Sequence, residues 1–361
     1  MRILHIINSL NTGGAEKLIV DTLPLYNKKN IKTDLLLLKK SDTILYKQIG
    51  EENLNIFSID AKSYYNFSNI FKLKKYIGKY DIIHAHLFPT VYLLALCRFL
   101  FYPKKIIIYT EHSTNNKRRD KFYFKWIEKF IYSQYNKIIC ISKGTEIKLI
   151  KHLGNSCKNK LITIDNGVNL SVFNANELQA DIRNKEKIVL TQVSSFRYPK
   201  DQDTIIRSLK LLPENVIVQL AGSGPRLDEC KKLAEQLNLQ DRVIFLGQRS
   251  DIPEILYHTD ICIMSSFYEG LSLSSVEAMA CKKPIVASNV EGLKEVIEGF
   301  GILFEAGNEK ELATEILRLI NDNVYYNQVA ELCYKRSKDY DINIMVSNYI
   351  AVYKNELINK L

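Results

Sequence analysis

Short apolar runs alternate with amphipathic stretches along the whole 361-residue chain. Strands buried on both faces of a parallel sheet read as continuous apolar runs, whereas helices repeat apolar positions every three to four residues. The first half predicts strands at 2–8, 33–38, 54–59, 81–85, 105–110, 137–141 and 160–165. The second half predicts strands at 187–193, 215–221, 242–246, 260–264, 284–287 and 301–304. This alternation of strands with helices predicts two α/β domains, each built on a parallel sheet.

The two arrays are joined by a polar stretch at 169–187, where we expect the domain boundary. We therefore predict one domain at 1–170 and a second at 186–340. After about residue 305 the pattern becomes wholly helical, and 341–361 is expected to form a C-terminal helix. A chain of this length is too long for one ordinary core and suits two domains of about 150–200 residues each.

Composition adds the class of protein to this picture. Hydrophobic residues make up 46% and charged residues 25% of the chain, as in a folded globular protein. The seven cysteines form no C-x-x-C pair and mostly lie in apolar runs, so we expect reduced, buried thiols and a cytoplasmic protein. Because Met1 leads directly into a strand-like run, no signal peptide is expected. The most apolar segment, 91–102, contains Arg98 and is too short to cross a bilayer.

Charge is distributed unevenly between the two halves. Residues 1–180 hold 28 Lys and Arg against 14 Asp and Glu, a net of +14, whereas 181–361 hold 22 against 26, a net of −4. A basic half suggests an anionic partner, which could be a membrane surface, a phosphorylated lipid or a nucleic acid. The alternative is a basic surface that is merely solvated.

Candidate chemistry in the first half falls where predicted strands end. Ligands of open parallel sheets bind beyond the carboxyl ends of the strands, where helices begin. The residues singled out there are a glycine pair, two histidines two positions apart and a Glu-His pair: Gly13, Gly14, His84, His86, Glu111 and His112. A glycine pair can be only a tight turn, and a lone histidine is often structural, so their weight comes from converging on one edge.

The second half repeats this arrangement. Arg197 and Lys200 follow its first strand, and a glycine turn, "AGSGPR", follows its second. That turn lacks the G-x-G-x-x-G pattern of dinucleotide-binding proteins. Two cations, a glycine turn and a Gly-Leu-Ser helix entry on one sheet edge suit a pyrophosphate. Glu269 and Glu277 flank that helix entry; Ser274 with Glu277 also matches a capping box, which would make Glu277 structural.

The spacing Glu269-x7-Glu277 followed by "AMACKKPIVAS" resembles the signature of retaining glycosyltransferases, family 4 in particular. Further blocks resemble that family in order along nearly the whole chain: "TGGAEK", "DIIHAHL", "TEHS", "CISKGTEI", "IDNGVNLSVF", "FRYPKDQDTII", "AGSGPR" and "NVEGLKEVI". The resemblance implies the GT-B fold, with two Rossmann-like domains facing across a cleft. It also implies an N-terminal acceptor domain, a C-terminal nucleotide-sugar domain and a terminal helix that crosses back to the first domain.

The resemblance also implies roles for matching residues. Glu269 would bind hydroxyls of the donor sugar, Glu277 the ribose, and His112 would lie near the sugar and acceptor. Arg197 and Lys200 would hold the donor diphosphate. The remaining donor-binding positions act through their backbone: Gly270, Leu271, Ser272, Gly13, Gly14, Gly222 and Gly224.

Three positions depart from the family pattern. Only Tyr198 and Pro199 separate Arg197 from Lys200, which could displace either side chain. Glu291 stands where a second glycine is common, so that only Gly292 and Glu295 carry over from that block. The third departure is Ser223 in the glycine turn, where an acid is frequent.

The implied reaction is transfer of a sugar from a UDP- or GDP-sugar to a saccharide or lipid-linked saccharide, with retained anomeric configuration. No D-x-D pattern falls at a predicted strand end, so Arg197 and Lys200 are expected to replace a metal cofactor. Two basic, aromatic stretches, 63–80 and 118–137, favour a peripheral location at the inner face of the cell membrane. Nucleic acid is not expected as a partner, because no groove-reading motif is present. Alternatives are a nucleotide-sugar 2-epimerase of the same fold and a non-catalytic nucleotide-sugar-binding protein.

Overall fold

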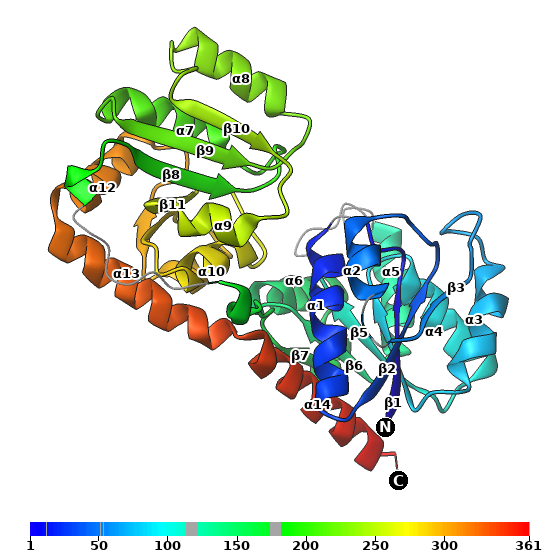
Figure 1. Cartoon of the computed structure of the whole chain (residues 1–361). Coiled ribbons are helices and arrows are strands. Elements are labelled where there is room, and N and C mark those ends of the chain that lie inside the picture. Colours follow the sequence, from blue (N-terminus) through cyan, green and yellow to red (C-terminus); the bar gives the residue numbers. More distant parts are fainter. Residues whose placement is uncertain (12, 51, 53, 113–121, 174–181, 361) are drawn as a thin grey trace. The chain divides into compact units, whose positions relative to one another are not determined.

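The computed structural model describes the chain apart from residues 12, 51, 53, 113–121, 174–181 and 361 (Figure 1). The chain divides into two compact units. Unit 1 comprises Met1–Gly167 together with Ile342–Leu361, and unit 2 comprises Val168–Asp341. The thirteen predicted strands are all present, with bounds that differ from those expected by no more than about two residues. The prediction of two parallel-sheet α/β domains is therefore confirmed.

Unit 1 contains a seven-stranded sheet in the order β3-β2-β1-β4-β5-β6-β7, in which all neighbouring strands are parallel. Its strands are β1 Arg2–Ile7, β2 Lys32–Leu37, β3 Ile56–Ser58, β4 Ile82–His86, β5 Ile106–Glu111, β6 Lys137–Cys140 and β7 Leu161–Thr163. The central strands β4 and β5 are buried along their whole length. Burial on both faces explains why the sequence shows them as unbroken apolar runs.

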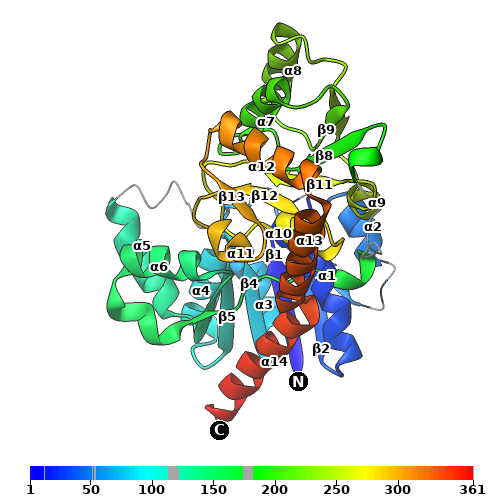
Figure 2. The ribbon, with the colours of Figure 1, turned by 90° about the vertical axis from the view of Figure 1, so that its left-hand side faces the viewer.

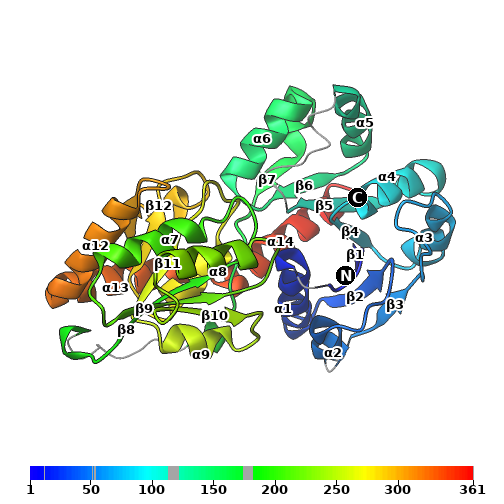
Figure 3. The same ribbon diagram turned by 90° about the horizontal axis from the view of Figure 1, so that it is seen from above.

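Two layers of helices cover this sheet (Figure 3). The helices are α1 Gly14–Lys28, α2 Ile44–Gly50, α3 Asn69–Ile77, α4 Thr90–Phe101, α5 Phe122–Ser133, α6 Lys143–Leu153 and α14 Ile342–Ile358. One layer is formed by α1 with α2 and α14, and the other by the succession α3, α4, α5 and α6. A separate apolar core lies beneath each layer. The last helix of the chain thus belongs to unit 1 and buries Tyr353 there completely.

Unit 2 contains a six-stranded parallel sheet in the order β10-β9-β8-β11-β12-β13. The strands are β8 Ile188–Val193, β9 Val216–Ala221, β10 Val243–Gly247, β11 Ile261–Met264, β12 Ile285–Ser288 and β13 Ile302–Phe304. The helices are α7 Gln202–Ser208, α8 Leu227–Gln236, α9 Ile252–Tyr257, α10 Leu273–Ala280, α11 Lys294–Ile297, α12 Glu309–Asn321 and α13 Asn323–Ser337. Helix α7 packs against α8 and α12, and α10 packs against α13 (Figure 2). Helix α9 also contacts α10.

In each sheet the order in which successive strands are added reverses once, at a pair of neighbouring strands that are not consecutive in the chain. In unit 1 this switch point lies between β1 and β4, and in unit 2 it lies between β8 and β11. At a switch point the two following connections leave toward opposite faces, so the strand ends open into a crevice where ligands of such sheets bind. The two switch points therefore locate the candidate sites.

Candidate functional site

The β8–α7 loop of unit 2 carries both predicted cations and is anchored by Asp201. The Asp201 carboxylate caps α7 by accepting a hydrogen bond from the Thr204 amide at 3.3 Å, and it also accepts one from Ser265 Oγ at 3.0 Å. The Asp201 amide donates to the Ser265 carbonyl at 3.1 Å. Because Ser265 directly follows β11, this buried carboxylate ties the loop to the neighbouring strand across the switch point.

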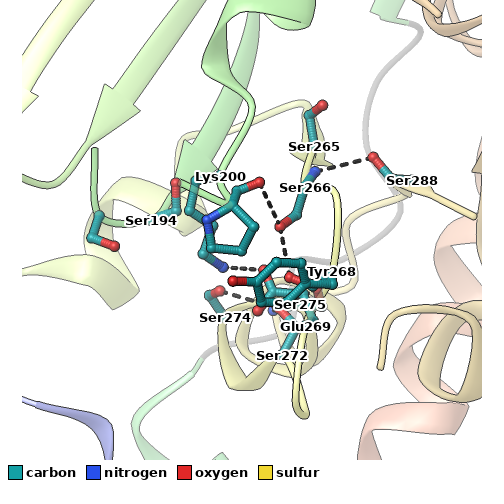
Figure 4. A network of polar contacts seen from close by, with 12 residues as sticks. Ser194, Lys200, Ser265, Ser266, Tyr268, Glu269, Ser272, Ser274, Ser275 and Ser288 are labelled. Atoms are coloured by element: carbon teal, nitrogen blue, oxygen red, sulfur yellow. Dashed lines mark hydrogen bonds and ion pairs between the residues drawn. The ribbon is translucent and has the colours of Figure 1, made fainter. Parts of the chain in front are cut away.

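Ser266 strengthens the same link (Figure 4). Its hydroxyl lies 3.2 Å from the Pro199 carbonyl and 3.0 Å from the Tyr268 carbonyl, and the Phe267 amide donates to Pro199 at 3.0 Å. These contacts join the loop after β8 to the loop after β11. A run of small hydroxylated residues that is unremarkable in the sequence thus sets the positions of both loops.

Lys200 and Glu269 come together on these two joined loops. Lys200 Nζ forms an ion pair with the Glu269 carboxylate (Figure 4), and the side chains are 16% and 12% exposed. A ligand that separates two such poorly solvated charges must offer each of them a new partner, because an unpaired buried charge is costly. A phosphate can do this for Lys200, and sugar hydroxyls can do it for Glu269.

Arg197 lies on the same loop but is exposed. Within the described part of the chain its guanidinium has no hydrogen-bonding partner, whereas its carbonyl accepts from the Lys200 amide at 2.8 Å. The structure therefore places the two predicted cations in different environments. Lys200 is paired within the site, and Arg197 remains available to an anion that approaches from solvent.

The helix entry after Glu269 differs from the expectation for Ser274. The N-cap of α10 is Ser272, whose Oγ accepts from the Ser275 amide at 3.4 Å and from Ser275 Oγ at 2.8 Å. The predicted capping box of Ser274 with Glu277 is therefore wrong: Glu277 is the fifth residue of α10, beyond the reach of a cap. Glu277 is half-buried. The backbone of Gly270, Leu271 and Ser272 leads into the positive end of the α10 dipole.

Gly222 and Gly224 pack closely against the backbone of the β8–α7 loop. A side chain added to Gly222 would place Cβ 2.0 Å from the Ser194 carbonyl oxygen, and one added to Gly224 would place it 2.3 Å from that of Phe196. Both glycines also have positive φ angles, 144° and 155°. The predicted glycine turn thus acts here by allowing two backbone segments to pack closely.

Gly292 has the corresponding position beneath Glu269. Its φ is +88°, and an added Cβ would lie 2.5 Å from the Glu269 carbonyl oxygen. The Gly292 amide donates to the Glu295 carboxylate at 2.6 Å, and the Glu269 amide donates to the Glu291 carbonyl at 3.2 Å. These contacts place the Glu269 backbone and explain the Gly292 and Glu295 pair that carries over from the family pattern.

A D-x-D sequence does occur in unit 2, at Asp201 and Asp203, within the entry to α7. The Asp201 carboxylate is occupied by the Thr204 amide and the Ser265 hydroxyl. Asp203 accepts from the Arg226 guanidinium at 2.8 Å. Both carboxylates thus serve the internal structure of unit 2.

In unit 1 the predicted glycine pair lies at the start of α1. Gly13 is the N-cap residue in extended conformation, and Gly14 is the first residue of the helix with open space around its Cα. The preceding loop is tied to the β4–α4 connection, because the side-chain Nδ2 of Asn8 donates to the Phe88 carbonyl at 2.7 Å. The glycine pair therefore belongs to the switch point between β1 and β4.

Four histidines of unit 1 gather at this switch point: His5, His84, His86 and His112. His86 Nδ1 lies 3.1 Å from His112 Nε2, and His86 Nε2 lies 3.0 Å from Nδ1 of His5. His84 instead contacts Tyr353 Oη at 2.7 Å through Nδ1 and Thr110 Oγ1 at 2.8 Å through Nε2. Sequence reasoning missed His5, which lies in the apolar run of β1 and comes to His86 only because β1 and β4 are neighbours in the sheet.

Burial lowers the pKa of each histidine in this group. The pKa of His5 falls to about 3 and that of His112 to about 4, while those of His84 and His86 lie well below the usual value. The rings are therefore neutral at pH 7. Glu111, predicted beside His112, is buried and accepts a hydrogen bond from Tyr132 Oη at 2.8 Å, so it acts as a structural acceptor.

A face of exposed aromatic side chains extends over α3, α4 and α5 of unit 1. Its members are Phe71 on α3, Phe99 on α4, and Trp126 and Phe130 on α5, exposed by 63%, 55%, 70% and 42%. The Phe99 and Phe130 rings lie 5.4 Å apart, and Lys129 Nζ lies 5.1 Å from the Trp126 ring. Arg118, Arg119 and Lys121, predicted to form part of this surface, lie outside the described residues.

Among the described helices, none combines the length and apolar character needed to span a bilayer.

Comparison with known families identifies related proteins over almost the whole chain. The family described as Glycosyltransferase Family 4 matches residues 12–172, and the one described as Glycosyl transferases group 1 matches residues 174–336. The chain is 27% identical over 317 residues to the UDP-Gal:alpha-D-GlcNAc-diphosphoundecaprenol alpha-1,3-galactosyltransferase of Escherichia coli, covering 81% of this chain and 79% of that protein. It is 24% identical over 351 residues to the N-acetylgalactosamine-N,N'-diacetylbacillosaminyl-diphospho-undecaprenol 4-alpha-N-acetylgalactosaminyltransferase of Campylobacter jejuni, covering 93% and 94%.

Solved structures share the fold over the full length. HepE of Anabaena, crystallised with UDP and glucose, superposes with a TM-score of 0.84 at 22% identity and covers 100% of both chains. The sucrose-phosphate synthase of Thermosynechococcus elongatus superposes with a TM-score of 0.78 at 20% identity, covering 99% of each chain. These similarities establish the GT-B fold.

Proposed function

The chain belongs to the group 1 glycosyltransferases of family 4, and on that premise we propose that it is a retaining enzyme that transfers a sugar from a nucleotide-diphosphate sugar to a lipid-linked saccharide. The observation that carries this proposal is the contact between Lys200 and Glu269 at the β8/β11 switch point. A diphosphate-binding cation and a hydroxyl-binding carboxylate in direct contact suit a ligand with phosphate joined to sugar.

Donor binding would exchange the internal ion pair for contacts to the ligand. Lys200 and the exposed Arg197 would bind the diphosphate, and Glu269 would accept hydrogen bonds from hydroxyls of the sugar. Glu277 on α10 would bind the ribose. The backbone amides from Gly270 to the N-terminus of α10 would add their dipoles to the stabilisation of the diphosphate.

A UDP-sugar is favoured as the donor over a GDP-sugar. HepE was crystallised with UDP-glucose as well as with UDP, and the name of the Escherichia coli relative specifies UDP-Gal. The names of the Escherichia coli and Campylobacter jejuni relatives specify acceptors linked to diphospho-undecaprenol. Another relative, 28% identical over 305 residues, is named as an O-antigen biosynthesis glycosyltransferase. A lipid-linked saccharide in surface polysaccharide assembly is therefore the acceptor we propose.

The rate of such a transfer depends on stabilising the diphosphate as it leaves. Preorganised cations and amide dipoles do this without reorganising, and one such donor typically contributes about 2.7–4 kcal/mol to lowering the barrier. We assign this role to Lys200, Arg197 and the α10 entry, in place of a divalent cation. Attack by the acceptor on the face that the diphosphate leaves would retain the anomeric configuration.

Unit 1 would bind the inner face of the cell membrane and so hold the enzyme close to its lipid-linked acceptor. Lysines lie beside rings on helices α3, α4 and α5. Lys129 lies over Trp126 of the aromatic face, and Lys74 Nζ is 4.4 Å from the ring of Phe101, which contacts Phe71 of that face. Aromatic rings enter the interfacial region of a bilayer, and each nearby cation adds about 1 kcal/mol on an anionic leaflet. An anionic membrane surface is therefore the partner that fits this face.

The direct test is a donor and acceptor screen with the purified full chain. UDP-glucose, UDP-galactose, UDP-N-acetylglucosamine and GDP-mannose would be offered, first alone and then with polyprenyl-diphosphate-linked saccharides, and nucleotide release and the glycolipid product would be measured. We expect release from a UDP-sugar that accelerates with the lipid-linked acceptor, and a product of unchanged anomeric configuration. Inverted configuration, or an epimerised donor without transfer, would refute the proposal.

A further inference from the structure

Three histidines of unit 1 form an unbroken line of hydrogen bonds that ends at His112. His5 lies on β1, His86 ends β4, and His112 follows β5. These strands are consecutive neighbours in the sheet. His5 Nδ1 lies 3.0 Å from His86 Nε2, and His86 Nδ1 lies 3.1 Å from His112 Nε2. The middle ring thus uses both of its nitrogens within the line.

The proton count of this line is fixed by its environment. Each ring is neutral at pH 7 because burial lowers its pKa, and a neutral imidazole carries a single N–H. His84 adds no proton, since its two nitrogens bond to Tyr353 and Thr110. His86 must therefore donate in one of its two bonds and accept in the other, so only two arrangements of the line exist.

The two arrangements differ at the ends. In one, His5 donates to His86 and His86 donates to His112, which leaves a bare Nε2 on His5 and a proton on Nδ1 of His112. In the other, all protons move to the opposite nitrogens, so His5 buries an Nε2–H and His112 presents a bare Nδ1. His5 is 2% exposed, and within the described residues its Nε2 has no hydrogen-bonding partner.

The buried end selects between them. In protein interiors an N–H group without an acceptor is rarer than an acceptor without a donor. A buried group left unpaired costs its full desolvation free energy. The arrangement with a bare Nε2 on His5 is therefore the stable one. This arrangement also determines the tautomer of His112, two rings away. Each ring that accepts a hydrogen bond at one nitrogen must carry its own proton on the other nitrogen.

We infer that the His5–His86–His112 line holds His112 in its Nδ1–H tautomer, so that His112 serves the substrate as a hydrogen-bond donor and not as a general base. Its Nε2 is already occupied by His86, and its Nδ1 already carries a proton. His5 and His86 are then positioning residues that act through His112. The inference rests on the proposed function for the identity of the substrate, and on the geometry of unit 1 for the tautomer.

The chemistry of such a donor is specific. Nδ1–H can bind a sugar hydroxyl oxygen or an oxygen on which negative charge develops. It cannot take the proton that an attacking hydroxyl releases. As the bond from the anomeric carbon to the diphosphate breaks and the new glycosidic bond forms, that proton passes to an oxygen of the leaving diphosphate. The family resemblance implies a position for His112 near the sugar and acceptor, and the histidine line adds which of its two nitrogens would act there and in which protonation state.

The tautomers can be read directly by NMR. Long-range ¹H–¹⁵N correlations on the full chain labelled with ¹⁵N-histidine distinguish protonated from bare ring nitrogens, and H86N and H112N assign the signals. We expect Nδ1–H and bare Nε2 for His5, His86 and His112 at pH 7. A proton on Nε2 of His112, or a mixture of tautomers in the wild type, overturns the inference.

Two substitutions of His5 test the coupling along the line. H5F keeps an aromatic ring but removes the donor, so His86 and His112 should become tautomeric mixtures. H5N restores an N–H near the position of Nδ1 and should restore the single tautomer of His112. A purely structural role of His5 would alter stability in both variants and leave the tautomer of His112 unchanged, which would overturn the coupling. If H5F does not fold, the wild-type assignment alone still decides.

Substitutions of His112 test the donor role in transfer. The amide nitrogen of asparagine mimics Nδ1, whereas that of glutamine mimics Nε2. H112N should therefore keep kcat within about tenfold of wild type, while H112Q and H112A lose about 100- to 1000-fold, as on removal of one preorganised donor. Equal losses in all three variants overturn the donor role. The NMR result needs no substrate, so failure to detect transfer would count against the proposed function and leave the tautomer test in force.

Discussion

Lys200 and Glu269 are 69 positions apart in the sequence, yet the ammonium of one contacts the carboxylate of the other. The pairing exists because β8 and β11 are neighbours in the unit 2 sheet and their loops are joined through Asp201 and Ser266. Each charge is therefore stabilised by the other. A nucleotide sugar would supply both with new partners at the same time.

Replacing Glu269 with glutamine should separate sugar recognition from nucleotide binding. Hydrogen bonds to charged groups contribute about 1.5–3 kcal/mol, so E269Q should lower kcat/KM for transfer by about 10- to 100-fold. UDP affinity should be nearly unchanged, because UDP has no transferred sugar. Calorimetric titration with UDP alongside transfer kinetics measures both quantities.

K200A should instead weaken UDP binding itself by about tenfold or more, since it removes a charge-assisted contact to phosphate. K231A, at an exposed lysine of α8, is the matched control and should behave as wild type. Equal loss of UDP affinity in E269Q and K200A would contradict the assignment of separate roles.

The close approach beneath Glu269 predicts a specific effect of G292A. Alanine at a φ of +88° costs about 1–2 kcal/mol in backbone conformation, and the clash of its Cβ with the Glu269 carbonyl adds about 1–3 kcal/mol. Transfer activity should fall as well, because the loop that carries Glu269 must move. The matched control is G299A, whose φ is +81° with open space around it. Chemical denaturation should show only the conformational cost there, and equal destabilisation in the two variants would remove the close-approach argument.

Lys283 should be a source of instability. Its side chain is fully buried, its Nζ has no hydrogen-bonding partner in the described residues, and burial lowers its pKa to about 8. Between pH 8 and 10.5 the unfolded state binds more protons than the folded state, so this residue makes the protein more stable as the pH rises through that range. This lowering of the Lys283 pKa corresponds to a loss of at most about 3 kcal/mol from the free energy of unfolding. K283M should therefore unfold at higher urea concentration at pH 7.5, with an advantage that shrinks by pH 10; a constant or negative difference would contradict the buried charge.

The histidine group predicts that unit 1 is sensitive to acid. Because the folded-state pKa values of His5 and His112 lie below the ordinary 6.5, the unfolded state binds the extra protons and stability falls as the pH drops below 6.5. At pH 5 each such histidine should cost about 2 kcal/mol. Urea unfolding followed by circular dichroism and peptide-resolved hydrogen exchange between pH 7 and 5 measures this. In H5N about one proton fewer should be taken up on unfolding, so the free energy of unfolding should depend less steeply on pH. An unchanged pH dependence would contradict burial of a neutral His5.

The aromatic face predicts reversible binding to anionic vesicles. Exchanging Phe71, Phe99 and Trp126 for serine together should reduce co-sedimentation with anionic vesicles at low salt, and high salt should weaken wild-type binding because it screens the lysines. V324S is the matched control, since Val324 on α13 is 68% exposed but lies in unit 2. Equal binding of the triple variant and wild type would move the membrane contact elsewhere, as would equal binding to neutral and anionic vesicles.

The sequence by itself determined the two-domain α/β architecture. Strands such as β4 and β5 lie buried on both faces of the sheet and therefore need nearly continuous apolar residues. Because this requirement falls on a few consecutive residues, it is visible in the amino-acid sequence. It also determined the family, because the ordered motifs sample nearly the whole chain. The glycine turn at Gly222 and Gly224 could be predicted as well, since only glycine allows so close an approach of two backbone segments.

Only the tertiary structure decided which residues meet. The order of strands in a sheet differs from their order in the chain, so the partners of Lys200 and His86 depend on β8 lying beside β11 and β1 beside β4. The choice of Ser272 over Ser274 as the α10 cap likewise follows from where the chain leaves the Glu269 loop. Sequence periodicity reports spacing along one element, whereas ion pairs, hydrogen-bond lines and protonation states arise between elements and depend on the burial that packing creates.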